Sequence, residues 1–295
     1  MTNDHPKPRL VIGCGYLGLR VAKLWRDSGD VVYAVSRSRQ RADRLREEEG
    51  LKTIVGDVLD PASLADLPEV ASVLFAVGYS RTSEASIHEV YVEGLRNVLD
   101  ALPAASGPVV YISSTGVYAQ KDGQWVDEDS ECEPDREGGR ACLAAEQCLV
   151  AHLRGAGATI LRMAGIYGPG RLPRSLDLIA GHPIPAPADG YLNLIHVDDA
   201  ARIVVAAAKR TGPIRTYLVS DGSPTTREEY FKQLACQLNA PPPQFEQHVE
   251  DPPRRARGTS SKRVSNQRVA EELDYELNYP SYCEGLAGIV GEGGV

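Results

Sequence analysis

The segment "VIGCGYLG", residues 11–18, constrains the fold of this chain more than any other stretch. It follows a short apolar run and opens a helical pattern, so it predicts a strand, a tight turn and a helix. In such a turn Gly13 permits the sharp bend, Gly15 lets backbone approach a pyrophosphate, and Gly18 allows close packing of the helix on the strand. The prediction is a dinucleotide-binding turn, with a plain tight turn as the alternative. Further candidates for cofactor contact in this turn are Cys14, Tyr16 and Leu17.

Short apolar runs and longer helical patterns alternate through the first half of the chain. The expected strands are 9–13, 31–36, 52–56, 72–77, 108–113 and 158–165. The expected helices are 16–28, 38–49, 84–102 and 138–155. Strands separated by helices of this length form a parallel sheet, and near-continuous apolar strands are covered by helices on both faces. The predicted fold class is α/β, a Rossmann doubly wound parallel sheet.

From residue 166 the alternation gives way to segments rich in glycine and proline. Two further strands are expected, at 191–197 and 215–220. Helices are expected at 198–210, at the segment that begins "TTREEYFKQL", and at 264–273, and residues 240–263 are expected to be extended. We therefore expect an NAD(P)-binding Rossmann domain over residues 1–165. A smaller, interleaved substrate lobe is expected over 166–295, with 191–220 returning to the main sheet.

Composition limits the partners of this chain. Its 295 residues are 42% hydrophobic and 24% charged, with a formal net charge of −8, which argues against a general nucleic-acid or anionic-membrane surface and favours a small-molecule substrate. The N-terminal segment has neither a signal-peptide core nor a membrane span, so we expect a cytoplasmic protein. Six cysteines without a C-x-x-C pair indicate reduced thiols, with neither disulfides nor a metal site.

The end of the second expected strand indicates which dinucleotide binds. NAD enzymes usually place an acidic residue there for the ribose 2′-hydroxyl, whereas this chain has Ser36 followed by Arg37. A guanidinium without a neighbouring carboxylate suits a 2′-phosphate, which predicts NADP, with NAD as the alternative. In the competing interpretation, Arg37 and Arg39 are exposed residues that open the next helix. Other cofactor candidates, at the ends of the third and fourth strands, are Asp57, Val58, Ala76, Val77 and Gly78.

Taken together, seven segments resemble the extended short-chain dehydrogenase/reductase superfamily, in particular the NAD-dependent epimerase/dehydratase proteins. They are "VIGCGYLG", "GDVLD", "YISSTGVYA", "VDEDSECEP", "LAAEQ", "LRMAGIYGPGR" and "NLIHVDDAA", in the order and spacing of that family. Typical members act on nucleotide sugars through NAD(P), using a serine or threonine, a tyrosine and a lysine. The resemblance places the hydroxyl residue at Ser114, with Tyr118 close by in sequence as a second catalytic candidate.

The same resemblance exposes a departure from the family. The tyrosine position is occupied by Gly138 and the lysine position by Cys142, and neither residue type occurs anywhere from 122 to 162. A phenol with a pKa of about 10 acts as an acid or base near neutrality only when a nearby cation lowers that pKa, and the family's lysine does this. The chain therefore resembles an atypical subgroup that lacks the usual pair. Cys142 is interpreted as a buried structural cysteine.

Further candidates follow from the later motifs. Ile166 and Tyr167 resemble the segment whose backbone meets the nicotinamide carboxamide. His196 is either a substrate contact or a hydrogen-bonded core histidine. The arginines of the 240–263 segment, Arg254 and Arg255 with Arg257, are either a diphosphate clamp or a solvated basic loop.

Three functions remain open at this stage. The first is an NADP-dependent, epimerase-like oxidoreductase acting on a nucleotide sugar or related carbonyl compound. The second is a non-catalytic NADP-binding regulator or sensor. The third is a structural relative that has lost useful cofactor affinity, which the complete glycine turn and Arg37 disfavour. The alanine- and leucine-rich helices at 84–102 and 138–155 further predict a homodimer.

Overall fold

The computed structural model describes residues 8–246 and 261–291, which form two compact units. Unit 1 contains the described residues up to Val117 together with Glu137–Arg162 and Ala201–Tyr217. Unit 2 contains Tyr118–Arg136, Met163–Ala200 and the described residues from Leu218 onward. The chain therefore leaves unit 1 and returns to it twice, and each unit is assembled from segments distant in sequence.

A seven-stranded sheet forms the centre of unit 1, in the order β11-β7-β5-β4-β1-β2-β3. Its strands are β1 (Arg9–Ile12), β2 (Val32–Ser36), β3 (Lys52–Val55), β4 (Ser72–Phe75), β5 (Val109–Ser114), β7 (Thr159–Met163) and β11 (Arg215–Val219). The pairs from β3 through β5 are parallel. The order of the strands reverses between β1 and β4, which is where a doubly wound sheet binds its ligand.

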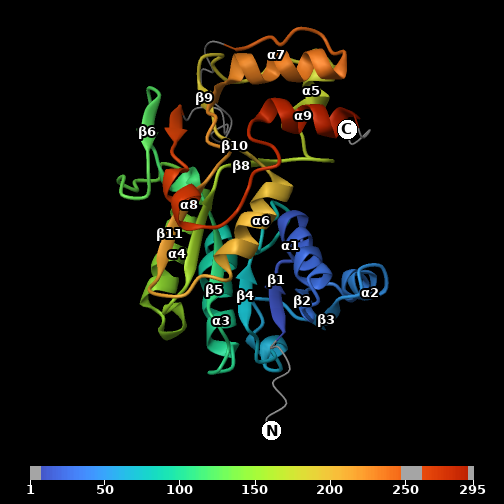
Figure 1. Ribbon diagram of the computed structural model, residues 1–295, viewed down its shortest axis with the longest axis vertical. Helices are drawn as coiled ribbons and strands as arrows, with labels where there is room; N and C mark the ends of the chain where they lie inside the picture. Colours follow the sequence, from blue (N-terminus) through green and yellow to red (C-terminus); the bar gives the residue numbers. More distant parts are fainter. Residues whose placement is uncertain (1–7, 247–260, 292–295) are drawn as a thin grey trace. The chain divides into compact units, whose positions relative to one another are not determined.

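Helices cover both faces of this sheet. They are α1 (Tyr16–Asp27), α2 (Arg39–Glu47), α3 (Gly94–Ala101), α4 (Glu137–Ala151) and α6 (Val197–Ala207). Leu10 and Ile12 of β1 pack in one apolar cluster with Leu95 of α3 and Leu149 of α4, while Val11 points to the other face, where α1 crosses. The arrangement of α1 and α2 beside β1, β2 and β3 is visible in Figure 1. This alternation follows from the period of two along a strand.

Short connecting elements complete unit 1. They are the 3-10 turns Pro61–Leu64, Thr115–Val117 and Leu153–Gly155, and a π-helical turn Glu89–Glu93 that runs into α3. The helix expected at 84–102 therefore begins three residues later, at residue 87, and its π-helical turn over Glu89–Glu93 is wider than an α-helix. None of the described helices is long and apolar enough to span a membrane.

Unit 2 consists of small sheets and a helical group. Its strands are β6 (Gln124–Val126), β8 (Gly165–Tyr167), β9 (Tyr191–Leu192), β10 (Leu194–His196), β12 (Thr225–Thr226) and β13 (Lys262–Val264), and its helices are α5 (Ser175–Ile179), α7 (Arg227–Leu238), α8 (Gln267–Glu272) and α9 (Tyr282–Gly291). The strands pair as β10-β8, β12-β9 and β13-β6. Helices α5, α7 and α9 lie together in Figure 1. Tyr230 and Leu234 of α7 and Leu286 of α9 belong to one apolar cluster.

The observed units refine the domain boundaries expected from the sequence. The first boundary falls between Val117 and Tyr118, and a later one between Arg162 and Met163, whereas the sequence analysis expects a single boundary at residue 165. Residues 118–136 nevertheless belong to unit 2, because β6 pairs with β13 across more than a hundred residues. Of the returning segment 191–220, only β11 enters the main sheet, while β9 and β10 pair within unit 2.

Candidate functional site

The glycine turn after β1 is built by close contact between backbones. Gly13 has a φ of +92°, and a Cβ there would lie 2.5 Å from the carbonyl oxygen of Ala76, which follows β4. A Cβ on Gly18 would lie 2.3 Å from the carbonyl oxygen of Gly13. Neither position can hold a larger residue without moving the backbone, so the two glycines bring β1, β4 and α1 together at the switch point of the sheet.

The same turn leaves open space where a phosphate would lie. A Cβ on Gly15 or on Gly78 would meet no other atom within 4 Å. Gly15 is also the N-cap of α1, and no side chain caps that helix. The first amide groups of a helix are unsatisfied donors at its positive end, so this uncapped terminus beside open glycines suits a pyrophosphate. The residues present therefore fit a dinucleotide, as the sequence predicts.

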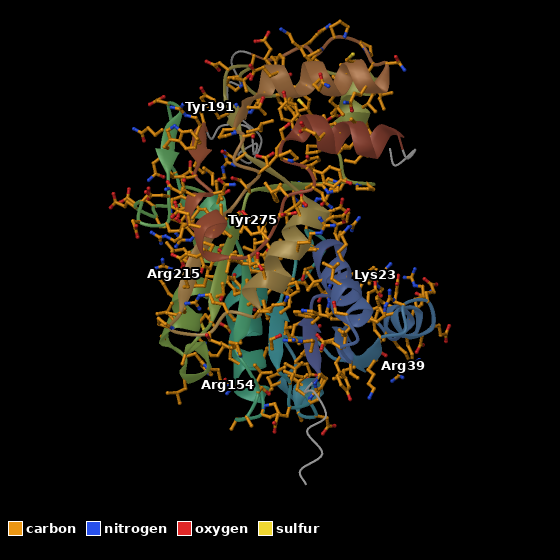
Figure 2. The ribbon with its side chains drawn as sticks, in the orientation of Figure 1. Lys23, Arg39, Arg154, Tyr191, Arg215 and Tyr275 are labelled. Carbon is orange, nitrogen blue, oxygen red and sulfur yellow. The ribbon has the colours of Figure 1, made fainter. Side chains whose placement is uncertain are left out.

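The end of β2 presents cations without a carboxylate partner. The guanidinium groups of Arg37 and Arg39 make no hydrogen bond or ion pair with another described residue. Arg39 is the first residue of α2 and is labelled in Figure 2. Ser38, between the two arginines, caps α2 by accepting from the amide of Arg41. The Ser36 hydroxyl donates to the Ser38 carbonyl at 3.3 Å, and no acidic residue stands in this turn.

The other predicted contacts at the adenosine end also lie on unit 1. One carboxylate oxygen of Asp57 accepts from the amide of Leu59 at 2.9 Å, which orients the side chain at the end of β3. Val58 packs against Gly94, where a Cβ would come within 2.7 Å of it. Val77 packs against the apolar cluster of unit 1. Cys14 is buried, and burial raises the pKa of its thiol to about 11 against the opposing charge of Arg41, so it is a neutral side chain at pH 7.

The serine predicted at the catalytic position ends β5. The Ser114 Oγ accepts from the amide of Gly116 at 3.0 Å, which fixes the oxygen and leaves its own proton to be donated. A Cβ added at Gly116 would lie 4.0 Å from the Cα of Gly139 on α4. The start of α4 therefore passes directly beside the end of β5.

Two residues on α4 define what this site lacks. Gly138 lies in the first turn, and a Cβ there would lie 3.7 Å from Cδ1 of Ile87, so the position is not crowded. Cys142 is 7% exposed, and burial, with the nearby Glu146 carboxylate, raises the pKa of its thiol to about 12. It is a neutral, buried side chain, in agreement with the structural interpretation from the sequence. Within the described residues no group of three or more His, Cys, Asp or Glu side chains is arranged to hold a metal ion.

A buried ion pair fastens α4 to the sheet one turn further on. The Arg162 guanidinium of β7 donates to the Glu146 carboxylate at 2.7, 3.1 and 3.2 Å, and the Ser113 hydroxyl donates to the same carboxylate at 2.5 Å. The side chains of the pair are only 9% and 5% exposed. This network holds Gly138 and Cys142 at the end of β5.

Comparison with known proteins places this geometry in a family. The model of the NAD dependent epimerase/dehydratase family matches residues 9–219, which include the glycine turn, Ser114 and α4. The chain belongs to this family. It carries the NAD(P)-binding, epimerase-like oxidoreductase fold, and a nicotinamide dinucleotide is its cofactor.

Individual relatives cover nearly the whole chain. A solved structure from Methylobacillus flagellatus, described as an NAD-dependent epimerase/dehydratase, is 31% identical, with a TM-score of 0.78, and the match covers 98% of this chain and 99% of that one. Protein YeeZ of Escherichia coli K12 is 26% identical over 92% of this chain and 95% of its own. A 3-diazoavenalumate denitrifying reductase of a Streptomyces species is 28% identical over 94% and 98%.

Unit 2 holds the other residues that the epimerase/dehydratase pattern singles out. Tyr118 is 2% exposed, and Tyr167 is fully buried, with its hydroxyl 3.5 Å from the Ser281 carbonyl oxygen. His196 is 1% exposed, with its ring centroid 3.9 Å from that of Tyr279, and its Nδ1 accepts from the amide of Asp198. All three side chains are buried, and the role of His196 as a substrate contact stays a prediction. Arg254 and Arg255 lie outside the described residues.

Sequence reasoning missed a buried lysine in unit 2. Lys262 of β13 is 6% exposed, and its Nζ donates to the carbonyl oxygen of Tyr118 at 3.0 Å. The three-residue strands β6 and β13 are too short to carry a periodic signal. No local pattern therefore indicated that Lys262 is buried.

Proposed function

We propose that this protein is an NADP-dependent, epimerase-like oxidoreductase that acts on a nucleotide sugar or a related carbonyl compound through an atypical active site. The observation that carries the proposal is the combination of the open glycine turn with the unpaired arginines at the end of β2. The first supports binding of a dinucleotide, and the second supports the choice of NADP.

The preference for NADP rests on charge at the end of β2. Arg37 and Arg39 are exposed and have no described partner, so both guanidinium groups are available to a ligand. With Ser36 in place of an acid, a 2′-phosphate meets no repulsion there and gains a charge-assisted hydrogen bond. NAD lacks that phosphate and gains nothing from either arginine.

The chemistry proposed for this site uses fewer side chains than usual. When bound, the nicotinamide supplies or accepts a hydride. The Ser114 hydroxyl, oriented by the amide of Gly116, would hold the reacting oxygen of the substrate, and a water molecule would move the proton, because the Tyr118 side chain is only 2% exposed. A missing general acid typically costs about 10² to 10⁴ in rate, which favours substrates that are already activated.

The substrate class follows from the family and from one relative. Typical members act on nucleotide sugars, and the Streptomyces relative is named as a reductase. We therefore place this chain among enzymes that transfer hydride to or from a small organic substrate. We also propose that it works in the cytoplasm, where its six cysteines would stay reduced.

A second candidate function has one observation in its favour. Gly138 and Cys142 supply neither a proton nor a cation, so a protein that binds NADP without turnover would show the same α4. In this case the protein would report NADP levels to a partner. Activity separates the two candidates, since only the enzyme changes the absorbance of the reduced nicotinamide when a substrate is added.

The experiment that tests the proposal is a titration of NADPH and NADH into wild type, Arg37→Ala and Arg44→Ala, followed by a panel of nucleotide sugars. Arg44 is an exposed arginine on the same helix, α2, and serves as the control. A charged hydrogen bond contributes about 1.5–3 kcal/mol, so Arg37→Ala should weaken NADPH binding roughly tenfold to a hundredfold and leave NADH unchanged. Equal affinity of wild type for both dinucleotides would refute the NADP assignment.

A further inference from the structure

A cavity of about 370 Å³ lies where three strands of the main sheet begin. Its lining comes from the chain just before β5, β7 and β11, in the segments 106–108, 153–157 and 210–212. All three segments belong to unit 1. The cavity is therefore a feature of unit 1 alone.

This cavity is separate from the glycine turn. Strands β1, β4 and β5 are parallel, so they begin at one edge of the sheet and end at the other. The glycine turn follows the end of β1, whereas the cavity lies at the edge where β5 begins. The six residues of β5 span about 20 Å between these two edges. A ligand in the cavity would leave the dinucleotide site free.

Measured contacts join the three segments around the cavity. A Cβ added at Gly157 would lie 3.3 Å from the carbonyl oxygen of Gly212 and 4.0 Å from the Cβ of Pro108. The Arg154 guanidinium reaches the first segment, because its Nη2 donates to the carbonyl oxygen of Ser106 at 2.7 Å. The lining is thus held together by direct contacts within unit 1.

Two arginines of this lining each keep a buried nitrogen without a partner. They are Arg154, which is labelled in Figure 2, and Arg210. Arg154 Nε and Arg210 Nη1 are buried and have no hydrogen-bond acceptor in the described part of the chain. The other described bonds of these guanidinium groups go to backbone carbonyl oxygens. Neither arginine forms an ion pair with a described carboxylate.

Backbone amides add further donors to the same lining. Four of them donate to no acceptor within residues 8–246 and 261–291, those of Ala156, Gly157, Thr211 and Gly212. No acidic residue is among the described residues that line the cavity. In a chain with a formal net charge of −8, this lining presents only positive charge.

The hydrogen bonds to backbone carbonyls do not account for both arginines. A buried donor is ordinarily hydrogen-bonded, and Arg154 Nε and Arg210 Nη1 are not. A water molecule could accept from either nitrogen, but it would leave both charges uncompensated. A carboxylate or phosphate group does both, because it accepts charge-assisted hydrogen bonds from guanidinium groups. The volume lies in the range of about 300–1,000 Å³ that is usual for small-molecule sites.

We propose that this cavity binds a small metabolite through an oxyanion group, a phosphate or a carboxylate, held by Arg154 and Arg210. The site is additional to those of the dinucleotide and the substrate. It does not depend on the proposed reaction.

The test is calorimetric titration of inorganic phosphate, succinate and glycerol into the full-length protein saturated with NADPH, at low ionic strength. NADPH fills the phosphate sites of the dinucleotide, so an anion that binds does so elsewhere. The variants are Arg210→Met, Thr211→Glu and the control Arg44→Met, which removes an exposed arginine of α2. We expect wild type and Arg44→Met to bind phosphate or succinate but not glycerol. Arg210→Met should weaken that binding about tenfold to a hundredfold.

The second variant keeps the test decisive. Thr211 is exposed, so Thr211→Glu should fold and should weaken anion binding by about tenfold or more, because it places a carboxylate in the lining. It decides the question if Arg210→Met does not fold. The anion that binds more tightly identifies the group as phosphate or carboxylate.

Three results would overturn the proposal. They are a wild type that binds neither anion, glycerol binding as tightly as the anions, and anion binding that neither variant weakens. In each case NADPH binding, measured first, still stands for the proposed function. If the protein does not bind NADPH, the same titrations are run without it, and the comparison of variants decides the anion site by itself.

Discussion

The ion pair between Glu146 and Arg162 offers a direct test of how α4 is anchored. Replacing Arg162 by Met removes three donor contacts from a carboxylate that is 5% exposed and leaves it the Ser113 hydroxyl as its described partner. Breaking a buried pair on one side costs about 3–5 kcal/mol, because the other charge stays buried without its partner. At about 2–4 °C per kcal/mol, Arg162→Met should lower the melting temperature by about 6–20 °C.

The double variant distinguishes a desolvated pair from two independent contributions. Glu146→Leu with Arg162→Met removes both charges and fills the space with apolar groups, so it should be more stable than either single variant and lie within about 2 kcal/mol of wild type. The control is Lys232→Met, which breaks an exposed pair and should change the free energy of unfolding by less than about 1 kcal/mol.

The assay is scanning calorimetry without cofactor, because a bound dinucleotide would add its binding free energy to the measured stability. Additive losses, with the double variant less stable than both single variants, would refute the reasoning. They would mean that Glu146 and Arg162 each contribute through packing rather than through their mutual charge.

Three further predictions concern the glycine turn, the altered active site and assembly. Gly18→Ala should lower the free energy of unfolding by about 1–3 kcal/mol, because its Cβ would lie 2.3 Å from the Gly13 carbonyl oxygen. Gly15→Ala should fold normally and bind NADPH more weakly. Melting curves measure the first effect, and cofactor titrations measure the second. The double variant Gly138→Tyr with Cys142→Lys should fold, because a Cβ at position 138 is not crowded, and it should gain dehydrogenase activity toward a nucleotide sugar. A double variant that folds and binds NADPH but has no activity would favour the non-catalytic regulator. Sedimentation at micromolar concentration with cofactor should show a homodimer, and a monomer would contradict this prediction. Leu95 of α3 and Leu149 of α4 pack in the apolar cluster of unit 1, so other residues of these two helices would have to form the dimer contact.

The features that the sequence determined by itself are local ones. The β1 strand, the glycine turn and α1 are contiguous, so the spacing of Gly13, Gly15 and Gly18 specifies a sharp bend and a close helix before any tertiary contact is known. The strands and helices of unit 1 follow the expected ranges within a few residues, apart from the wide π-helical turn before α3. The absence of a tyrosine and a lysine near α4 is also a property of the sequence alone.

Tertiary structure decided the burial and the long-range pairing. Tyr118 and His196 are polar residues of motifs, and only the packing of distant segments determines that they are buried. Lys262 is buried because β6 and β13 pair across more than a hundred residues, and its Nζ donates to the carbonyl oxygen of Tyr118. The free energy of a buried charge depends on which segments surround it, and three-residue strands have no periodicity that could encode their partners.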